Sequence, residues 1–215
     1  MKKLMMLALA AVLVTGATSA LALGPLDAEA ELPVYSKYVW RGMVETDDYV
    51  LQPAVGLGIL GFYASFWGNV DMTDINTSDF AETEWKFTEI DWTLGYTFGL
   101  PLFELGAGFI WYTYPQDTGT ETVEFYLGAE ASVILSPKLY VYQDLDAFKG
   151  AYWDASIGHG FALGETNQLN VTLGVGLGSE SYHGGYFGGG VFIPDTELSA
   201  SFTDARIVAD LPFHP

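Results

Sequence analysis

The chain contains no cysteine and no apolar run long enough to form a membrane-spanning helix. The absence of cysteine excludes the disulfide framework that stabilises many small exported proteins. Hydrophobic residues make up 50% of the sequence. Nevertheless, no window approaches the roughly 18 consecutive apolar residues of a spanning helix. Soluble folds and a closed β-barrel are the fold classes that remain.

Positive charge is scarce in the sequence. Eight Lys and Arg stand against 27 Asp and Glu, which gives a formal net charge of −19. Removal of Lys2 and Lys3 with an N-terminal leader would leave six basic residues, and 6 − 27 gives −21 for the mature chain. Such a surface repels phosphate backbones, so we expect no nucleic-acid partner. Inside a barrel the same surplus of acid would favour small solutes that carry positive charge.

The first 22 residues have the pattern of a cleavable secretory signal peptide. Lys2 and Lys3 precede an apolar stretch at 4–14, which is shorter than the about 20 residues needed to span a bilayer. Ala20-Leu21-Ala22 supplies the small-x-small pattern that a signal peptidase recognises. We therefore expect export, cleavage after Ala22, and one folded domain over residues 23–215.

Glycine and aromatic residues are abundant, and they alternate along short runs. The sequence has 25 Gly, 14 Phe, 13 Tyr and 6 Trp. Apolar and small or polar residues alternate with period two along the runs 62–70, 85–98, 102–114, 122–135 and 167–178. This composition disfavours helix and is typical of barrels. We expect an all-β fold, an antiparallel up-and-down transmembrane β-barrel of about 10–12 strands.

Strict alternation also assigns individual residues to faces. In the run 85–98 it places Thr88 with Trp92 on the apolar face, and Phe87 with Glu89 on the polar face. A soluble sandwich would bury the apolar face and expose Lys, Glu and Thr on the other, whereas here the second face carries many glycines. We interpret the small and polar face as the lumen and the apolar face as the lipid contact.

The connections are predicted to alternate between tight and longer ones, as in membrane barrels. A first strand is expected at about 32–43. Tight turns are expected at Leu60-Gly61, Gly99-Leu100 and Ser136-Pro137, longer connections at 44–49, 71–83 and 115–121, and short ones at 147–150 and 164–167. After Gly178 two alternatives stay open, namely a long loop or another hairpin over 179–203.

The segment Ser36-Lys37-Tyr38-Val39-Trp40-Arg41-Gly42-Met43 resembles the opening S-x-Y-V-F/W-R-G of the TorF-type family, which consists of uncharacterised proteobacterial outer-membrane β-barrel proteins. Gln52-Pro53 and the glycine-rich strands extend the resemblance over most of residues 32–213. The resemblance implies a barrel, and it supplies no catalytic residues.

The C-terminal end departs from the pattern of outer-membrane barrels, which finish on a strand with a terminal aromatic residue. Here the sequence stops at Leu211-Pro212-Phe213-His214-Pro215. Proline lacks the N–H that a closing strand needs. In the family, the segment that resembles 209–213 is followed by further strands, so we expect a C-terminal truncation of about two strands.

Strand parity places charged residues together on the predicted lumen face. Charges inside a membrane barrel are retained only when they are hydrated or paired. We hypothesise that Lys37 and Arg41 anchor an ion-pair network there; the alternative is that these charges lie in water near strand ends. The acids assigned to the network are Glu89, Asp91, Glu104, Glu124, Glu130, Asp144 and Asp154.

No motif for catalysis or for a cofactor is present. The three histidines lack metal-binding spacing, and no Ser, His and acid grouping lies in a nucleophile-elbow context. The acidic loop 71–84 lacks the pattern of a calcium loop, so we expect a solvated outer loop and no metal site.

We therefore expect a non-enzymatic, porin-like protein of the Gram-negative cell outer membrane. It would act as a pore or passive conduit for small solutes, or as a structural barrel. Its expected partners are outer-membrane lipid and the barrel-assembly machinery. The alternatives are a soluble periplasmic β-barrel or sandwich that binds a ligand, and an outer-membrane enzyme, for which the required Ser, His and acid grouping is missing.

Overall fold

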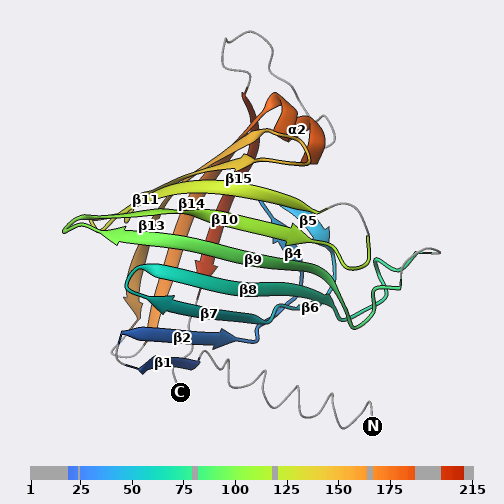
Figure 1. The fold of residues 1–215 in the computed structure, drawn as a ribbon, viewed down its shortest axis with the longest axis horizontal. Helices are drawn as coiled ribbons and strands as arrows, with labels where there is room; N and C mark the ends of the chain where they lie inside the picture. The colour runs from blue at the N-terminus through green and yellow to red at the C-terminus, as the bar shows by residue number, and fades with distance from the viewer. Residues whose placement is uncertain are drawn as a thin grey trace. The chain divides into compact units, whose positions relative to one another are not determined.

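The computed structural model describes residues 19–23, 25–78, 82–117, 121–163, 167–186 and 200–210; for 19–23, 163, 167–168 and 200–210 it describes the backbone alone. Over this part of the chain the protein is all-β and antiparallel, with one short helix (Figure 1). Two compact units are present, made of residues 1–40, 44–96 and 110–122, and of residues 41–43, 97–109 and 123–215.

Strands β1 to β9 lie mainly in the first unit. They are β1 (Ser19–Leu23), β2 (Leu26–Glu31), β3 (Val34–Tyr35), β4 (Tyr38–Trp40), β5 (Met43–Thr46), β6 (Val50–Leu51), β7 (Ala54–Ile59), β8 (Phe62–Asp71) and β9 (Lys86–Gly99). Strands β7, β8 and β9 run side by side (Figure 1), with Ile59 opposite Phe62 and Phe62 opposite Tyr96.

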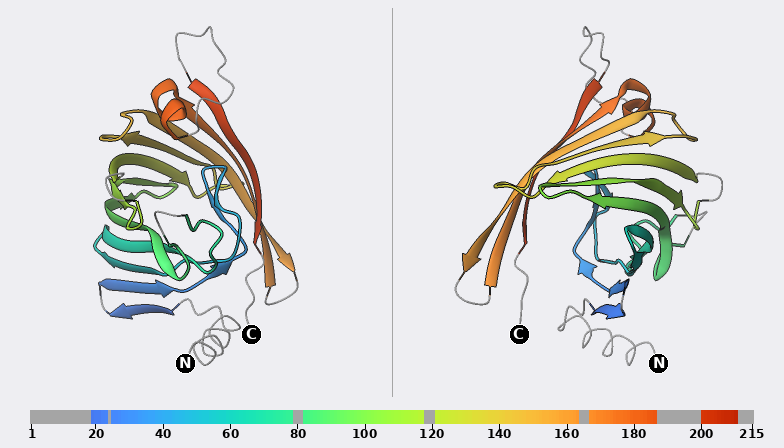
Figure 2. Two further views of the ribbon diagram at one scale, coloured as in Figure 1. Left: turned by 90° about the vertical axis from the view of Figure 1, so that its right-hand side faces the viewer. Right: turned by 60° about the vertical axis from the view of Figure 1, so that its left-hand side comes forward.

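The second unit is built mainly from the strands that follow. They are β10 (Phe103–Thr113), which both units share, β11 (Thr122–Ala131), β12 (Lys138–Asp144), β13 (Ala151–Leu163), β14 (Asn167–Ser179) and β15 (Ala200–Asp210), with helix α2 (Glu180–Tyr186) after β14. The long strands β13, β14 and β15 run together in both views of Figure 2, and each pairs with the next.

The strand order follows the sequence order along the main path of the sheet. Within the described residues, a 13-stranded sheet has the order β1-β2-β7-β8-β9-β10-β11-β12-β13-β14-β15; in addition, β6 pairs with β8, and β3 pairs with β6. Strands β4 and β5 form a separate two-stranded sheet. Antiparallel neighbours that follow one another in sequence are the arrangement expected from hairpin connections. The predicted all-β antiparallel class is therefore confirmed.

The burial of side chains is the reverse of that in a water-soluble protein. Large apolar side chains on alternate positions are exposed, for example Leu94 at 66% and Phe109 at 49%. Glu124 and Asn69 are completely buried. We call these two sides of the sheet the apolar face and the polar face. The predicted division of residues between two faces is confirmed within β10 and β11, where Trp111 and Leu127 are exposed and Tyr112 and Tyr126 are buried, but the predicted run 122–135 continues past the end of β11 into the connection.

Strict alternation is wrong in one place, at the start of β9. The register shifts between Asn69 and Val70, so that Asn69 pairs with Glu89 and Val70 with Phe87. Thr88 is the extra residue of this β-bulge, and its hydroxyl accepts a hydrogen bond of 2.9 Å from the Asn69 amide on the polar face. Phe87 instead contacts Phe66 on the apolar face, with ring centroids 6.1 Å apart.

The predicted first strand at 32–43 is also wrong, because the chain turns within it. Trp40-Arg41-Gly42-Met43 forms the turn between β4 and β5, and Arg41 and Gly42 have φ values of 45° and 86°. Two consecutive residues with positive φ are the signature of a type I′ hairpin turn. Arg41 therefore lies at the tip of a hairpin and not on a strand of the large sheet.

The tight turns were predicted with mixed accuracy. Leu60 and Gly61 form the two-residue turn between β7 and β8, as predicted. The second turn lies slightly later than predicted, since Leu100 and Phe103 exchange main-chain hydrogen bonds across it. The third is longer than predicted and runs over 132–137. The short connection predicted at 164–167 lies largely outside the described residues, as does the C-terminal segment 211–215.

Most of the segment 179–203, for which a long loop or another hairpin was predicted, lies outside the described residues, and only helix α2 and the start of β15 are described in it. Ser179 accepts a hydrogen bond from the Tyr182 main-chain N–H and thereby caps helix α2, and the segment ends in strand β15. Ser179-Glu180 is an N-terminal helix signal that the glycine content of the segment concealed. No described helix has the length and apolar character required to cross a membrane.

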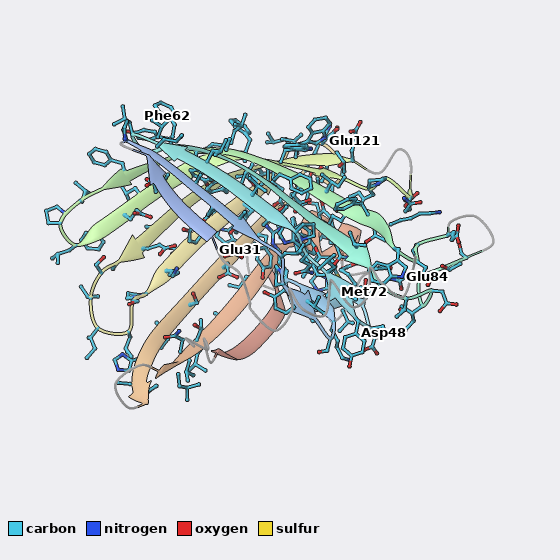
Figure 3. All side chains as sticks on the ribbon, turned by 90° about the horizontal axis from the view of Figure 1, so that it is seen from below. Glu31, Asp48, Phe62, Met72, Glu84 and Glu121 are labelled. Atoms are coloured by element: carbon cyan, nitrogen blue, oxygen red, sulfur yellow. The ribbon has the colours of Figure 1, made fainter. Side chains whose placement is uncertain are left out.

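The side chains along β8 illustrate how the two ends of the strands differ. In Figure 3, Phe62 lies at one end of β8 beside the Leu60–Gly61 turn, and Met72 lies just past the other end. Phe62 is 63% exposed, whereas Asp71 is completely buried. One end of the strand is therefore apolar and exposed, and the other ends in a buried polar cluster.

Candidate functional site

Rows of tyrosines and acids cross the polar face of the second unit. Tyr126, Tyr142 and Tyr152 lie directly opposite one another on β11, β12 and β13. Two residues along, Glu124 of β11 lies opposite Asp144 of β12. Directly opposed residues of an antiparallel pair project from the same face. Two buried carboxylates therefore lie beside a row of phenol rings.

Arg41 is brought to these residues by the hairpin turn between β4 and β5. Its φ of 45° lies in the left-handed region, which non-glycine residues seldom occupy. Such strained residues persist only where their surroundings hold them, and they are enriched at functional sites. The arginine side chain is 9% exposed. The turn therefore inserts a buried positive charge beside the polar face.

The guanidinium of Arg41 forms a bidentate pair with Glu124. The Nη1–Oε1 and Nη2–Oε2 distances are both 2.8 Å, and the Glu124 side chain is completely buried. The Tyr182 hydroxyl of helix α2 donates to Oε1 at 3.0 Å, and Arg41 Nη1 also donates to the Tyr182 oxygen. Parallel charge-assisted bonds of this kind are among the strongest in proteins.

Three phenol rings surround the guanidinium. Arg41 Cζ lies 4.2 Å from the ring centroid of Tyr142, 4.5 Å from that of Tyr152 and 5.6 Å from that of Tyr182. The negative face of an aromatic ring attracts a cation, more so when the cation is desolvated. We call Glu124 and these three tyrosines the arginine cage. Its charge and its aromatic faces both favour a planar cation.

Asp144 is satisfied by a different set of donors. Its Oδ1 accepts main-chain N–H groups of Asp146, Phe148 and Lys149, at 2.9, 3.2 and 3.2 Å. Its Oδ2 accepts the Tyr186 hydroxyl of helix α2 at 2.5 Å. These donors satisfy both oxygens of the buried carboxylate. Asp144 therefore orders the connection after β12 and binds α2.

Two glycines allow helix α2 to approach this connection closely. A Cβ at Gly150 would lie 2.4 Å from the main-chain N of Tyr182, and a Cβ at Gly185 would lie 2.2 Å from the ring of Phe148. Side chains at these positions would displace the helix. Tyr182, which comes from α2, reaches the cage because both glycines are present.

The structure brings together only some of the charged residues assigned to the ion-pair network. Arg41 and Glu124 form the pair described above. Lys37 instead pairs with Asp47, an acid outside the predicted set, and both side chains are at least half exposed. This placement corrects the assignment of Lys37 to an internal network. Lys37 lies in the connection before β4, where the chain leaves the strand geometry that the parity argument assumed.

The remaining acids have separate surroundings. Glu130 pairs with Lys138 at 2.8 Å and accepts the Tyr140 hydroxyl at 2.6 Å. Glu104 is exposed. Asp154 of β13 lies opposite Tyr140 of β12. The predicted network is thus divided into local groups.

Glu89 and Asp91 lie near the buried hydroxyl of Tyr38 in the first unit. Burial raises the pKa of Tyr38 far above its ordinary value, and the neighbouring carboxylates Glu89 and Asp91 raise it further. Tyr38 therefore stays neutral and acts as a hydrogen-bond donor to Glu89. Its ring also contacts Trp67, with centroids 5.4 Å apart.

A second buried polar cluster, which sequence reasoning missed, surrounds Asp71. The Asp71 carboxylate accepts hydrogen bonds from Thr46 at 3.0 Å, Asn69 at 3.1 Å and Asn76 at 2.8 Å. Gln52 donates to Asn69 at 3.1 Å. Donors occupy both carboxylate oxygens, so the cluster holds the ends of β5 and β8 together. Among the described residues, no group of three or more His, Asp or Glu side chains is arranged to hold a metal ion.

The tyrosines of the cage were also missed, although the sequence contained part of the signal. Tyr142 and Tyr152 have the same strand parity as Asp144 and Asp154 on β12 and β13, and that parity predicts the polar face. Tyr182 gave no such signal because it lies in a helix.

No protein-family model, curated protein or solved structure matches this chain. The chemistry of the site is therefore argued from its own geometry.

Proposed function

We propose that this protein is a non-enzymatic β-barrel of the Gram-negative outer membrane, which contacts lipid through its apolar face and encloses its polar face. The observation that carries the proposal is the reversed burial. Aromatic and aliphatic side chains are exposed along successive strands, while Glu124, Asp144, Asp71 and Asn69 are completely buried. In water, rows of exposed apolar side chains strongly favour aggregation, whereas in hydrocarbon they are the stable arrangement.

The backbone pairing supports the same proposal. Each long strand from β7 to β9, and from β11 to β15, is paired with its sequence neighbour in antiparallel register. Hydrocarbon offers no partners for N–H and C=O groups, so a spanning sheet must satisfy them internally. The proposal includes closure of the sheet into a barrel, because an open edge is not tolerated in a bilayer.

The polar face would then line the interior. Its buried acids outnumber its buried bases, and the whole chain carries 27 acidic and eight basic residues. We propose a passive conduit for small solutes, with a preference for cations, or a structural barrel that its interior side chains fill. The resemblance of Ser36–Met43 to the TorF-type family agrees with an outer-membrane location. Export would use the signal peptide proposed at 1–22.

Envelope fractionation and a gel-mobility assay test the proposal. The full coding sequence is expressed in a Gram-negative host, the envelope is fractionated, and unboiled and boiled samples are compared on a denaturing gel. We expect the protein in the outer-membrane fraction, with a mobility that changes on boiling. A periplasmic protein with the same mobility in both samples would contradict the proposal and would favour a soluble ligand-binding protein. Conductance in planar bilayers then separates a conduit from a filled barrel.

A further inference from the structure

We propose that the arginine cage is a binding site for a guanidinium-type organic cation, and that Arg41 occupies it as a tethered ligand. The inference goes beyond the proposed function, because it concerns residues of the second unit alone and holds whether or not the protein conducts solutes. It rests on the geometry around Arg41, on the way in which the hairpin is attached, and on the charge that would remain without it.

The cage has the shape of a guanidinium site. Both oxygens of Glu124 accept parallel N–H bonds at 2.8 Å, which requires a planar donor with two N–H groups on one edge. Tyr142 and Tyr152 present their rings to Arg41 Cζ at 4.2 and 4.5 Å. A planar cation is stabilised by both kinds of contact. An ammonium group is a compact charge that cannot donate two parallel N–H bonds from one planar edge.

Side-chain hydrogen bonds of Arg41 hold the hairpin tip to β11 and to helix α2. Strands β4 and β5 pair with each other in a two-stranded sheet and are not part of the 13-stranded sheet within the described residues. The bonds between Arg41 and Glu124 join residues 83 positions apart, and the bond to Tyr182 joins residues 141 positions apart. Release of the tip would therefore leave the hydrogen-bond ladders of β11, β12 and β13 intact.

Without Arg41 the cage would hold a buried negative charge. Glu124 is completely buried, and the Tyr182 hydroxyl is a neutral donor. Asp144 opposite it already accepts three main-chain N–H groups and the Tyr186 hydroxyl. A buried carboxylate that loses its cation is strongly destabilising. The vacated cage therefore attracts a replacement cation of the same shape.

Chemical rescue of Arg41→Ala tests the site directly. The full chain is refolded in detergent, and unfolding midpoints are measured with ethylguanidinium chloride or with ethylammonium chloride at equal ionic strength. We expect ethylguanidinium to raise the midpoint of Arg41→Ala in a saturable way, because a ligand stabilises the folded state that binds it. Wild type and the double variant Arg41→Ala/Glu124→Gln should show no such rise. Equal effects of the two salts, or equal effects on all three proteins, would overturn the site.

Limited trypsin digestion gives a second test that keeps Arg41 in place. Trypsin cleaves after Arg41 and after Lys37; the Arg41 side chain is 9% exposed, and Lys37 pairs with Asp47 on the surface. We expect Glu124→Gln to increase cleavage after Arg41 by about tenfold or more, because the tip is released from the cage. Cleavage after Lys86, which is 41% exposed and lies outside the hairpin, serves as the internal reference.

Asp47→Asn is the matched control, since it removes the acid of an exposed ion pair in the same hairpin. It should leave the cleavage rate after Arg41 at the wild-type value. If Glu124→Gln and wild type are cleaved after Arg41 at equal rates, the cage does not hold the tip and the inference is wrong. This digestion decides the question if Arg41→Ala does not refold. All samples are also checked for heat-modifiable mobility, so failure of the proposed function is scored separately.

Discussion

The two ion pairs of the β4–β5 hairpin differ in their burial. The Arg41–Glu124 pair is buried and bidentate, whereas Lys37 and Asp47 are 50% and 63% exposed. Loss of one member of a buried pair typically costs about 3–5 kcal/mol, because the other charge remains buried. An exposed pair contributes about 0–1 kcal/mol. The stability of the fold should therefore be far more sensitive to residue 124 than to residue 47.

Close packing at Gly128 supplies a prediction at this scale. Gly128 lies opposite Tyr140, and a Cβ there would lie 2.1 Å from the ring. The ring cannot move freely, because its hydroxyl donates to Glu130 at 2.6 Å. We expect Gly128→Ala to lower the free energy of unfolding by about 1–3 kcal/mol in urea titrations of the refolded protein.

Gly99→Ala is the control for this substitution. Gly99 is the last residue of β9, and nothing lies within 4 Å of a Cβ placed there. Its effect should stay within about 0.5 kcal/mol. Equal effects at the two positions would show that the Tyr140 ring does not restrict residue 128.

The buried phenol of Tyr38 predicts a dependence on pH. Burial and the neighbouring carboxylates Glu89 and Asp91 raise the pKa of Tyr38 above its ordinary value of 10.0. Because the folded state then holds the proton more tightly than the unfolded state, stability is unaffected below about pH 10 and falls as the pH rises above it. We expect this fall to be less steep in Tyr38→Phe.

Tyrosine absorbance at alkaline pH checks the same point. For the folded proteins, the absorbance of wild type minus that of Tyr38→Phe should show no ionisation step near pH 10, where exposed phenols titrate. An ionisation step near pH 10 that disappears in Tyr38→Phe would contradict the burial of this hydroxyl beside Glu89.

At the scale of elements, two-residue turns and register shifts between paired strands set the local geometry. Arg41-Gly42 and Leu60-Gly61 both have two consecutive positive φ values, so both close hairpins with the same hand of turn. The first turn carries a side chain that is needed in the cage. Leu60, in the second, is 77% exposed and has φ of 51°. A leucine in this conformation is strained.

Leu60→Asn should therefore stabilise the protein. Asparagine adopts positive φ more readily than leucine and is favoured at the first position of this turn. We expect a gain of about 1 kcal/mol in the free energy of unfolding, measured in urea. Leu60→Ala removes the same exposed side chain and keeps the strain, so it should give no comparable gain. A larger gain from alanine would mean that loss of exposed apolar surface, and not turn strain, decides the effect.

At the scale of the whole molecule, exposed apolar side chains in a strand and in a connection allow a test of the proposed membrane location. Leu94 lies on β9 and is 66% exposed, and Ile134 lies in a connection and is 82% exposed. In water, both would be surface positions at which a charge is tolerated. In a bilayer, the strand position contacts hydrocarbon and the connection contacts water or head groups.

We expect Leu94→Arg to cost about 2–4 kcal/mol and Ile134→Arg about 0–1 kcal/mol when folding into lipid vesicles is measured by urea titration. The difference follows from the depth of the charge in the bilayer. If both substitutions cost equally little, the apolar face does not contact hydrocarbon, and the proposed membrane location is wrong.

The sequence by itself determined the class of fold and most of the two faces. Period-two alternation is a local property, so it assigns Trp111 and Leu127 to the apolar face and Tyr112 and Tyr126 to the polar face without knowledge of the partner strands. The two-residue turn at Leu60-Gly61 was predicted for the same reason, because turn chemistry is local.

Only the tertiary structure decided the turn at Arg41, the bulge at Thr88 and the composition of the cage. The bulge depends on the register between two strands, which is not contained in either strand alone. The choice of Glu124, and not another acid, as the partner of Arg41 depends on contacts between residues 83 positions apart. Such contacts form only when the packed strands, the hairpin and helix α2 are all in place, because the burial that makes the pair strong is a property of the whole assembly of side chains.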